Sequence, residues 1–362
     1  RVESKRVRGF VASGGPAGKD DTANRPQAEA QQDHSPGLDG FPHGHPFFQS
    51  LLRRFKDPIL LAAGRGATTR QAVCPAPPPT IYPGCVTLNG DYLEVGESSR
   101  RSFGSEKNPL VSVVITTFNH ARFLEDALAS VASQTYEDLE VLVVDDGSTD
   151  ETPRVTAKWK EIDPRVRVLR HPNQGQRRSF IRGLNESSGD VICALDADDR
   201  FHPTKVEKAV TALVRHPEVT QVTNQRQIID EFGRLRTTRH FRLPSGDVRG
   251  QLLRWGRYNS ITTSCLTYPR WVLEEVVRDT LWWRDSVWDH YAMVGAAFLG
   301  PVLGLDEMLT DYRVHGQNAH HDVERNLAWR EAMVEAVNHW AERAGLTDRL
   351  EPTDDLERVL LS

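Results

Sequence analysis

The feature that most constrains the fold is a repeated alternation of apolar runs with an amphipathic segment after Pro109. Val111–Thr116, Leu139–Val144 and Val191–Leu195 are rich in β-branched and aliphatic residues, as is typical of strands buried on both faces. His120–Gln134 places apolar residues at helical spacing and predicts a helix with one buried side. Strands that alternate with helices at this interval form parallel sheets through right-handed crossovers, so we expect an α/β domain.

Weaker signals complete the repeat. Val166–Leu169 predicts a further strand, and Phe180–Glu186 predicts a helix before the strand at Val191. Ser148 and Glu151 have the spacing of a capping box at the start of the intervening helix. Together these segments predict a mostly parallel sheet flanked by helices.

Polar clusters follow three of the predicted strands. They are Thr116–Asn119, Asp145–Ser148 and Asp196–Asp199. Open α/β sheets bind ligands at the carboxyl ends of their strands, so these clusters predict a binding site at one sheet edge. Asp145 and Asp146 have two possible roles. A carboxylate here could accept a hydrogen bond from a nucleobase, or it could interact with the dipole at the N-terminus of the following helix.

The last cluster, Asp196–Asp199, holds three carboxylates within four residues. Like charges this close repel one another unless a cation lies among them. Carboxylate oxygens suit Mg²⁺ or Mn²⁺, which commonly bridge to substrate phosphates. A solvated acidic turn is the alternative, but the position directly after a buried strand favours a metal site. Arg200 and Phe201 stand where a calcium loop needs an oxygen ligand and glycine, which argues against calcium.

Three segments resemble family 2 glycosyltransferases with the GT-A fold: VSVVITTFNHARFLEDALASVASQTYEDLEVLVVDDGSTDET, SSGDVICALDADDRFHP and LDEMLTDYRVHGQN. Their order and spacing also match, and the resemblance spans Pro109–Asn318. It implies a Rossmann-like sheet and an inverting, single-displacement transfer of a sugar from a nucleotide-diphosphate donor to an acceptor hydroxyl. A UDP-sugar is the expected donor and Mn²⁺ or Mg²⁺ the expected cofactor.

The resemblance assigns roles to the acidic clusters. Thr116 and Asp146 match residues that contact the base and ribose of the donor, while Asp196 and Asp198 match the DxD pair. Asp198 would bind the metal, and Asp196 would hold the ribose or a metal-bound water. Asp199 would support the metal shell or the donor sugar.

Three later residues also acquire roles from the resemblance. Asp289, in WDHYA, falls where the family keeps its catalytic base, although a helix-start carboxylate near Trp283 and Trp288 is the alternative. Arg313 and His315 fall in a loop that closes over the diphosphate. His315 would be a further metal ligand, or would instead pack against the sheet.

The chain departs from the family pattern at two places. Phe180-Ile181 stand where an Arg-Asn pair is frequent in the family. Arg177 and Arg178 lie one turn earlier and could bind the diphosphate in place of that pair, or could form a solvated basic surface. Trp288 replaces the acidic residue often found before the base. Both departures bear on the active site and leave the acceptor open.

Gln251–Trp255 spells the QxxRW signature of processive synthases. In those enzymes the signature follows the catalytic base, whereas here it precedes Asp289. We therefore interpret it as a chance match in which Leu252 and Trp255 pack a helix.

The sequence leaves two alternative functions. One is a catalytically inactive GT-A-like module that binds nucleotide sugars, although intact Asp146, Asp196, Asp198 and Asp289 argue against it. The other is a sugar nucleotidyltransferase, which needs a basic, glycine-rich loop where Thr116–Asn119 stand. The net charge of −5 gives no basic field for nucleic acid.

The domain organisation follows from composition. Residues 1–108 predict a partly disordered or irregular extension, residues 109–320 the GT-A domain, and residues 321–362 a helical segment. Within the extension, residues 47–61 suggest a helix that either docks on the main domain or makes peripheral contact with a membrane. The acceptor could be a glycan, a lipid-linked molecule, a peptide or a small molecule.

The cysteines and the hydropathy suggest a compartment. Cys74, Cys85, Cys193 and Cys265 form no CxxC pair, which favours a reducing cytoplasm, and Cys193 is expected to be a buried apolar residue. No apolar run reaches the length of about 20 residues that a spanning helix needs. The predicted location is cytoplasmic, with peripheral membrane contact as an addition.

Overall fold

The computed structural model describes Tyr92 and residues 108–259, 262–279, 288–316, 318 and 323–351, and within the last range only the backbone of 323–330. The predicted N-terminal extension, apart from Tyr92 and Asn108, lies outside these described residues. So do the predicted helix at residues 47–61 and two of the cysteines, Cys74 and Cys85.

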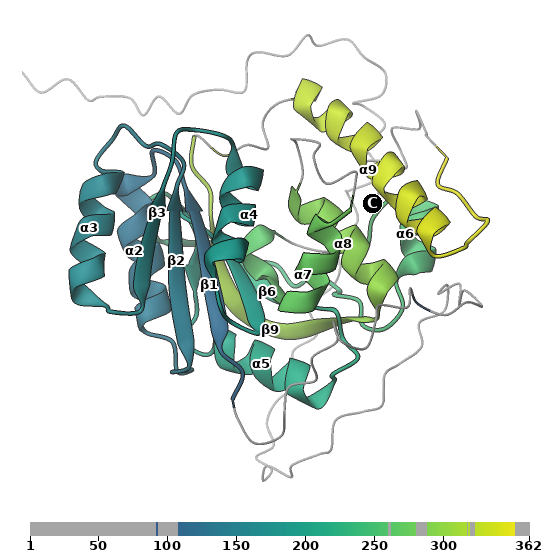
Figure 1. Cartoon of the computed structure of the whole chain (residues 1–362), viewed down its shortest axis with the longest axis horizontal. Helices are drawn as coiled ribbons and strands as arrows, with labels where there is room; N and C mark the ends of the chain where they lie inside the picture. The colour runs from purple at the N-terminus through teal and green to yellow at the C-terminus, as the bar shows by residue number, and fades with distance from the viewer. Residues whose placement is uncertain are drawn as a thin grey trace, which may run out of the picture. The chain divides into compact units, whose positions relative to one another are not determined.

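The described strands form one mixed, curled sheet (Figure 1). Its spatial order is β3 (Val166–Arg170), β2 (Leu139–Asp145), β1 (Val111–Thr117), β4 (Val191–Asp196), β8 (Leu266–Pro269), β6 (Gln221–Ile229), β9 (Val302–Arg313) and β5 (Arg200–Phe201), and β7 (Leu235–Thr238) pairs with β6. β8 runs antiparallel to both of its neighbours, β4 and β6, so β6 runs in the same direction as β4. β1 is parallel to β4 and β9 is parallel to β6, so these four strands share one direction. The prediction of a mostly parallel sheet is confirmed.

The register of the sheet aligns the strand ends. Thr116 pairs with Asp196, and Thr117 pairs with Asp145, because β1 lies in parallel between β2 and β4. β9 also ends at this edge, with Arg313 as its last residue. The polar clusters that follow separate strands in the sequence are therefore neighbours in space.

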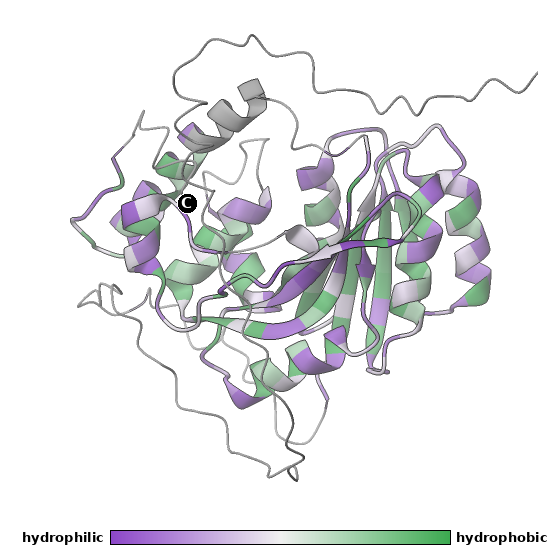
Figure 2. Ribbon diagram, turned by 180° about the vertical axis from the view of Figure 1, so that it is seen from behind, coloured by the Kyte–Doolittle hydropathy of each residue, from purple (hydrophilic) through white to green (hydrophobic). Residues whose placement is uncertain are grey.

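Helices cover both faces of the sheet, as the two hydrophobic clusters show. α2 (Ala121–Ala132), α3 (Thr152–Ile162) and α5 (Lys205–Arg215) share one cluster with Val113 and Ile115 of β1. On the other face, Val114 packs with Phe180 and Leu184 of α4 (Gln176–Glu186), in a cluster that includes α7 (Arg270–Val277), α8 (Trp288–Leu299) and α9 (Val323–Arg343). Successive strand residues point to opposite faces, so an uninterrupted apolar run supplies both clusters. In Figure 2 the hydrophobic colour is prominent on the strands in the middle of the sheet.

Several local predictions are confirmed. α2 occupies the predicted helix at residues 120–134. Cys193 is buried, and both it and Cys265 are free thiols. None of the described helices combines the length and the apolar character needed to cross a membrane.

Other local predictions need correction. α4 begins at Gln176, four residues before the predicted start at Phe180. The capping box is wrong, because α3 begins at Thr152 without a side-chain cap and the Ser148 hydroxyl accepts a hydrogen bond from the backbone N–H of Asn119 at 2.9 Å. That partner is remote in the sequence, which local spacing cannot reveal.

The packing predicted for the QxxRW segment is half right. Leu252 is buried in the short helix α6 (Arg249–Trp255), but the Trp255 side chain is 43% exposed at its end. Gly256 follows with a left-handed φ of 72° and ends α6 directly after Trp255.

Gly183 sets the close approach of α4 to the sheet, which gives a test of this packing. A Cβ at residue 183 would lie 2.5 Å from Val114 Cγ1 and 3.1 Å from Val144 Cγ2. We expect Gly183→Val to lower the free energy of unfolding by about 2–3 kcal/mol, because overpacking forces α4 and the strands apart. Urea denaturation measures the change. Asn185→Val introduces the same side chain at an exposed position of α4 and should cost no more than about 0.5 kcal/mol; equal losses in both variants would contradict the packing argument.

Candidate active site

The loop after β1 is tied to the loop after β2. Asn119 adopts a left-handed φ of 56°, a conformation that asparagine tolerates better than most residues. Its backbone N–H donates to the Ser148 hydroxyl at 2.9 Å, and its side-chain oxygen accepts from the backbone N–H of Thr149 at 2.8 Å. These contacts fix the position of the next residue, His120.

His120, Asp198 and His315 converge from the loops after β1, β4 and β9. Nε2 of His315 lies 2.9 Å from Oδ2 of Asp198, and the ligand atoms of all three residues lie within 4.8 Å of one another. The side chains of His315 and Asp198 are 4% and 14% exposed. Two imidazole nitrogens and one carboxylate oxygen make a donor set that suits a divalent transition metal, so the residues present fit a metal ion.

Sequence reasoning did not identify His120 as a site residue. It follows the predicted polar cluster Thr116–Asn119 by one position, and that position was the available signal. Burial lowers the pKa of His120 even though the charge of Asp198 raises it, which favours the neutral imidazole that binds metals. The pairing of Asp198 with His315 is consistent with the predicted metal ligands.

Asp196 and Asp289 lie beside this triad. The Thr263 hydroxyl donates to Oδ2 of Asp289 at 2.9 Å, and it also lies close enough to Asp196 to lower the pKa of that carboxyl. Gln176, the first residue of α4, donates to Oδ1 of Asp196 at 2.8 Å. Burial raises the pKa of Asp196 to about 8, with further contributions from the charges of Asp198 and Asp289, so these carboxylates share one site.

Thr263 reaches the site because β8 runs antiparallel to its neighbours β4 and β6. The short 3-10 helix Thr263–Cys265 precedes β8, and the start of an antiparallel strand lies where the parallel strands end. Ser264 also belongs to this segment, and its hydroxyl accepts a hydrogen bond from the backbone N–H of Asp196 at 3.1 Å. Sequence reasoning missed both residues, since neither belongs to an expected strand end.

Asp289 is the second residue of α8 and is held as a carboxylate. The backbone N–H of His290 donates to its Oδ1 at 2.9 Å. Burial would raise the pKa of Asp289, but the charge of His290 and hydrogen bonds from His290 and Thr263 together lower it to about 2. The side chain is therefore ionised at neutral pH.

Asp199 and Arg313 point into the protein. Oδ2 of Asp199 accepts from the Ser264 hydroxyl at 2.6 Å, and its Oδ1 accepts from the backbone N–H of Arg313 at 2.9 Å. The buried Arg313 guanidinium donates to the Asp198 carbonyl at 2.7 Å and to Asp126 at 2.8 Å. These contacts hold the main chain around Asp198, and the predicted contacts of Asp199 and Arg313 with the diphosphate or donor sugar stay predictions.

The predicted nucleotide contacts lie at adjacent strand ends. Thr116 is buried beside Asp196 in the sheet register. Asp146 accepts hydrogen bonds from the backbone N–H groups of Gln174 at 2.7 Å and Gly175 at 2.9 Å. Asp146 thereby fixes the loop that leads into α4, and its role as a nucleotide contact stays a prediction.

Phe180 and Trp288, the residues at which the chain departs from the family pattern, contact each other. The rings of Phe180 and Trp288 stack with centroids 3.7 Å apart and an angle of 20° between their planes. One ring belongs to α4 and the other to α8, so the stack links the helix that supplies Gln176 with the helix that supplies Asp289. An apolar contact thus occupies the position where charged residues are frequent in the family.

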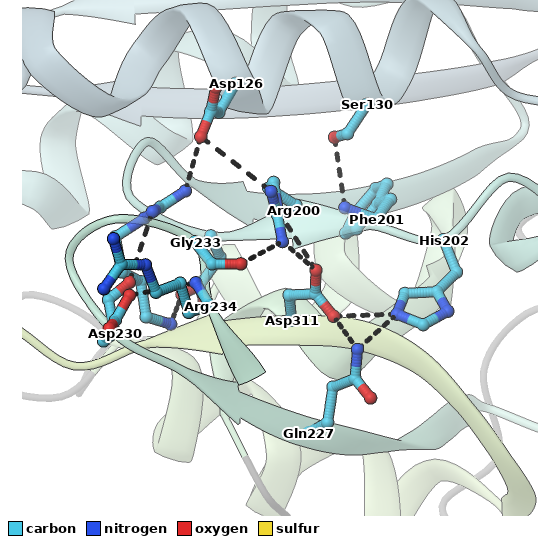
Figure 3. Close-up of polar contacts among 12 residues, drawn as sticks. Asp126, Ser130, Arg200, Phe201, His202, Gln227, Asp230, Gly233, Arg234 and Asp311 are labelled. Atoms are coloured by element: carbon cyan, nitrogen blue, oxygen red, sulfur yellow. Dashed lines mark hydrogen bonds and ion pairs between the residues drawn. The ribbon is translucent and has the colours of Figure 1, made fainter. Parts of the chain in front are cut away.

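A polar cluster next to the site fastens β5 to β9 (Figure 3). Arg200 donates to Oδ2 of Asp311 at 2.7 Å, while His202 and Gln227 each lie 2.7 Å from Oδ1. Burial would raise the pKa of Asp311, but the hydrogen bonds from His202, Gln227 and Arg200 outweigh it and lower the pKa to about 2. The cluster therefore stabilises β9, the strand that leads into the loop with His315.

Comparison with known proteins identifies the class of protein. The family model described as Glycosyl transferase family 2 matches residues 112–277. An uncharacterized glycosyltransferase of Nostoc sp. is 33% identical over 261 residues, which cover 68% of this chain and 80% of that protein. An uncharacterized glycosyltransferase of Haemophilus influenzae is 26% identical over 262 residues, 67% of this chain and 77% of that protein.

Solved structures with a similar fold are distant. S. aureus TarS 1–349 has a TM-score of 0.49 and 17% identity over 65% of each chain. The mannosyltransferase PcManGT from Pyrobaculum calidifontis, in complex with GDP-Man and Mn²⁺, has a TM-score of 0.46 and 20% identity over 66% of this chain and 65% of that chain. The sheet and its polar edge, with the sequence matches, define a glycosyltransferase of the GT-A fold. The chain belongs to glycosyltransferase family 2.

The Asp311 cluster predicts a dependence of stability on pH. Because folding lowers the pKa of Asp311, its contribution is complete above the unfolded value near 4 and is lost as the pH falls toward 2. We expect Asp311→Asn to lower the free energy of unfolding by roughly 2 kcal/mol at pH 7, and by less at pH 3. Urea denaturation at both pH values measures this. Asp306→Asn, at an exposed position of the same strand, serves as the control; a deficit that does not shrink at pH 3 would count against the ionic contribution.

Proposed function

We propose that this glycosyltransferase is metal-dependent and inverting, and that it transfers a sugar from a nucleotide-diphosphate donor, a UDP-sugar first among candidates, to an acceptor hydroxyl. The observation that carries the proposal is the convergence of His120, Asp198 and His315 beside Asp196 and Asp289. A donor diphosphate is the substrate group that needs a cation at such an edge. The acceptor hydroxyl belongs to a glycan, a lipid-linked molecule, a peptide or a small molecule.

The triad is the proposed metal site. Asp198 and His315 would hold Mn²⁺ or Mg²⁺, and His120 would supply a third ligand. A bound divalent cation offsets the negative charge that develops on a departing diphosphate. Arg313 and Asp199 support this site indirectly, because both fix the main chain next to Asp198.

Asp289 is the proposed general base. Its carboxylate accepts the proton of the acceptor hydroxyl while that oxygen forms a bond to the anomeric carbon of the sugar. The bond between the anomeric carbon and the diphosphate oxygen breaks in the same displacement, and its electron pair leaves with the diphosphate. A single displacement from the opposite face inverts the configuration at the anomeric carbon.

The low pKa of Asp289 is compatible with this role. A carboxylate with a pKa of about 2 is a weak base toward a free hydroxyl. The hydroxyl becomes strongly acidic as its oxygen bonds to the anomeric carbon, so proton transfer becomes favourable late in the displacement. Thr263 and His290 keep the carboxylate ionised and aimed until then.

The donor nucleotide would bind at the ends of β1, β2 and β4. Thr116, Asp146 and Asp196 are its proposed contacts. Oδ1 of Asp146 faces the N–H of Gln174 and lies 3.3 Å from Nδ1 of His171, whereas Oδ2 accepts only from the N–H of Gly175 among the described contacts and has a lone pair for a base or ribose. Asp196 adjoins both the triad and Asp289, which suits a contact with the ribose or a metal-bound water.

The metal site is tested by substitutions at its ligands. We expect Asp198→Asn to abolish Mn²⁺-dependent turnover of a UDP-sugar, and His120→Ala to weaken Mn²⁺ affinity by at least about 10-fold, since a ligand is lost. Isothermal titration with Mn²⁺ measures affinity apart from turnover. The exposed Asp306→Asn should change neither quantity. Full activity of Asp198→Asn would overturn the metal assignment.

The base is tested by an isosteric substitution. Asp289→Asn keeps the shape of the side chain and can still accept from Thr263, but it cannot take a proton. We expect transfer to fall by roughly 10²–10⁴-fold while the donor binds with unchanged affinity, as followed by donor-induced thermal shift. Loss of donor binding together with transfer would instead assign Asp289 to the donor site.

A further inference from the structure

The hairpin formed by β6 and β7 exposes large apolar side chains. Phe232 is 66% exposed and Leu235 is 59% exposed, the two highest values among large hydrophobic residues in the described part of the chain. All of residues 234–240 are exposed, so neither face of β7 is covered. Apolar surface of this kind lowers its free energy only when a partner removes it from water.

The segment that begins after the acidic turn residues Asp230 and Glu231 is basic, although the protein as a whole is acidic. Between Glu231 and Asp247 the sequence has four arginines and no acidic residue, although the whole chain carries a net charge of −5. Over the described residues, no carboxylate forms an ion pair with Arg234, Arg236 or Arg239. Asp230, at the start of the turn, uses its Oδ1 to accept from the backbone N–H groups of Phe232 and Arg234, each at 2.9 Å.

Apolar and cationic groups alternate in space as well as in sequence. The guanidinium carbons of Arg122 and Arg234 lie 5.6 Å and 5.4 Å from the centroid of the Phe232 ring. That of Arg239 lies 5.4 Å from the ring of Phe241. An exposed aromatic ring between guanidinium groups matches the boundary between lipid headgroups and acyl chains, where apolar and charged partners adjoin.

The turn of this hairpin is hydrogen-bonded to Arg200 (Figure 3) and to Arg313, which lies next to the candidate active site. Arg200 donates to the Gly233 carbonyl at 3.4 Å, and Arg313 donates to the carbonyls of Asp230 at 3.4 Å and Glu231 at 3.3 Å. The same Arg313 side chain holds the Asp198 carbonyl. The exposed tip is therefore mounted on the framework that carries the metal triad.

We propose that this hairpin surface, defined as Phe232, Arg234, Leu235, Arg236 and Arg239, docks the protein on a membrane that contains anionic lipid. Phe232 and Leu235 enter the headgroup region, and the arginines bind lipid phosphates. A soluble polyanion would engage the arginines alone and leave both apolar side chains in water, so the lipid surface accounts for more of what the hairpin presents. The docking surface does not depend on the proposed sugar transfer.

Vesicle sedimentation tests the proposal with the full chain. The wild type should bind vesicles of phosphatidylglycerol and phosphatidylcholine, bind less as NaCl is raised, and bind pure phosphatidylcholine weakly. Arg234→Glu/Arg236→Glu/Arg239→Glu should lower the partition coefficient by at least roughly 100-fold. Phe232→Ser/Leu235→Ser should lower it by about 10-fold or more without a change in charge.

The control is Arg154→Glu/Lys160→Glu/Arg215→Glu, which makes the same change of net charge at exposed positions on α3 and α5. It should bind anionic vesicles about as well as the wild type, and circular dichroism should show that all variants fold. Equal losses in the control and hairpin triple variants would overturn the proposal, because net charge alone would then explain binding. Full binding by Phe232→Ser/Leu235→Ser would also overturn it and would indicate a site for soluble polyanions.

Discussion

The close approach of carboxylates at the carboxyl edge of the sheet is the constraint around which this structure is arranged. Two unit charges about 4 Å apart repel by about 4 kcal/mol near a protein surface, a large part of the 5–15 kcal/mol that stabilises a typical domain. The fold opposes this repulsion with donors from separate elements: Gln176 from α4 and Thr263 from the segment before β8. The imidazole of His315 approaches from the end of β9. The donors explain why elements distant in sequence meet at this edge.

The central part of the fold could be predicted from sequence because its signals are local and strong. The apolar runs at Val111, Leu139 and Val191 are long enough to specify buried strands, and parallel pairing then forces their following residues together. The order of the motifs likewise placed Asp198 with His315, which the structure brings within 2.9 Å. Once the strands were assigned, the location of the site followed from topology.

The rest could not be predicted, because it depends on contacts between residues far apart in the chain. The antiparallel β8 inserts between β4 and β6 and delivers Thr263, a residue that no motif marked. The contacts of the Arg313 guanidinium with the Asp198 carbonyl and with Asp126 likewise join residues that no motif linked. Ser148 has a capping spacing but bonds to the Asn119 loop instead. In each case several partners suit the side chain chemically, and only the packed structure decides among them.

The origin of the candidate metal triad in three distant loops has a thermodynamic consequence. Residues 120, 198 and 315 become neighbours only when β1, β4 and β9 occupy one sheet, so the unfolded chain has no comparable cluster. An ion held there would behave as a reversible cross-link that closes very long loops, and it would stabilise the native state by about 2.7 kcal/mol at a concentration 100 times its dissociation constant. Binding of the ion and folding of the sheet would then be linked equilibria, and the supply of the cation would shift the fraction of the enzyme that is folded.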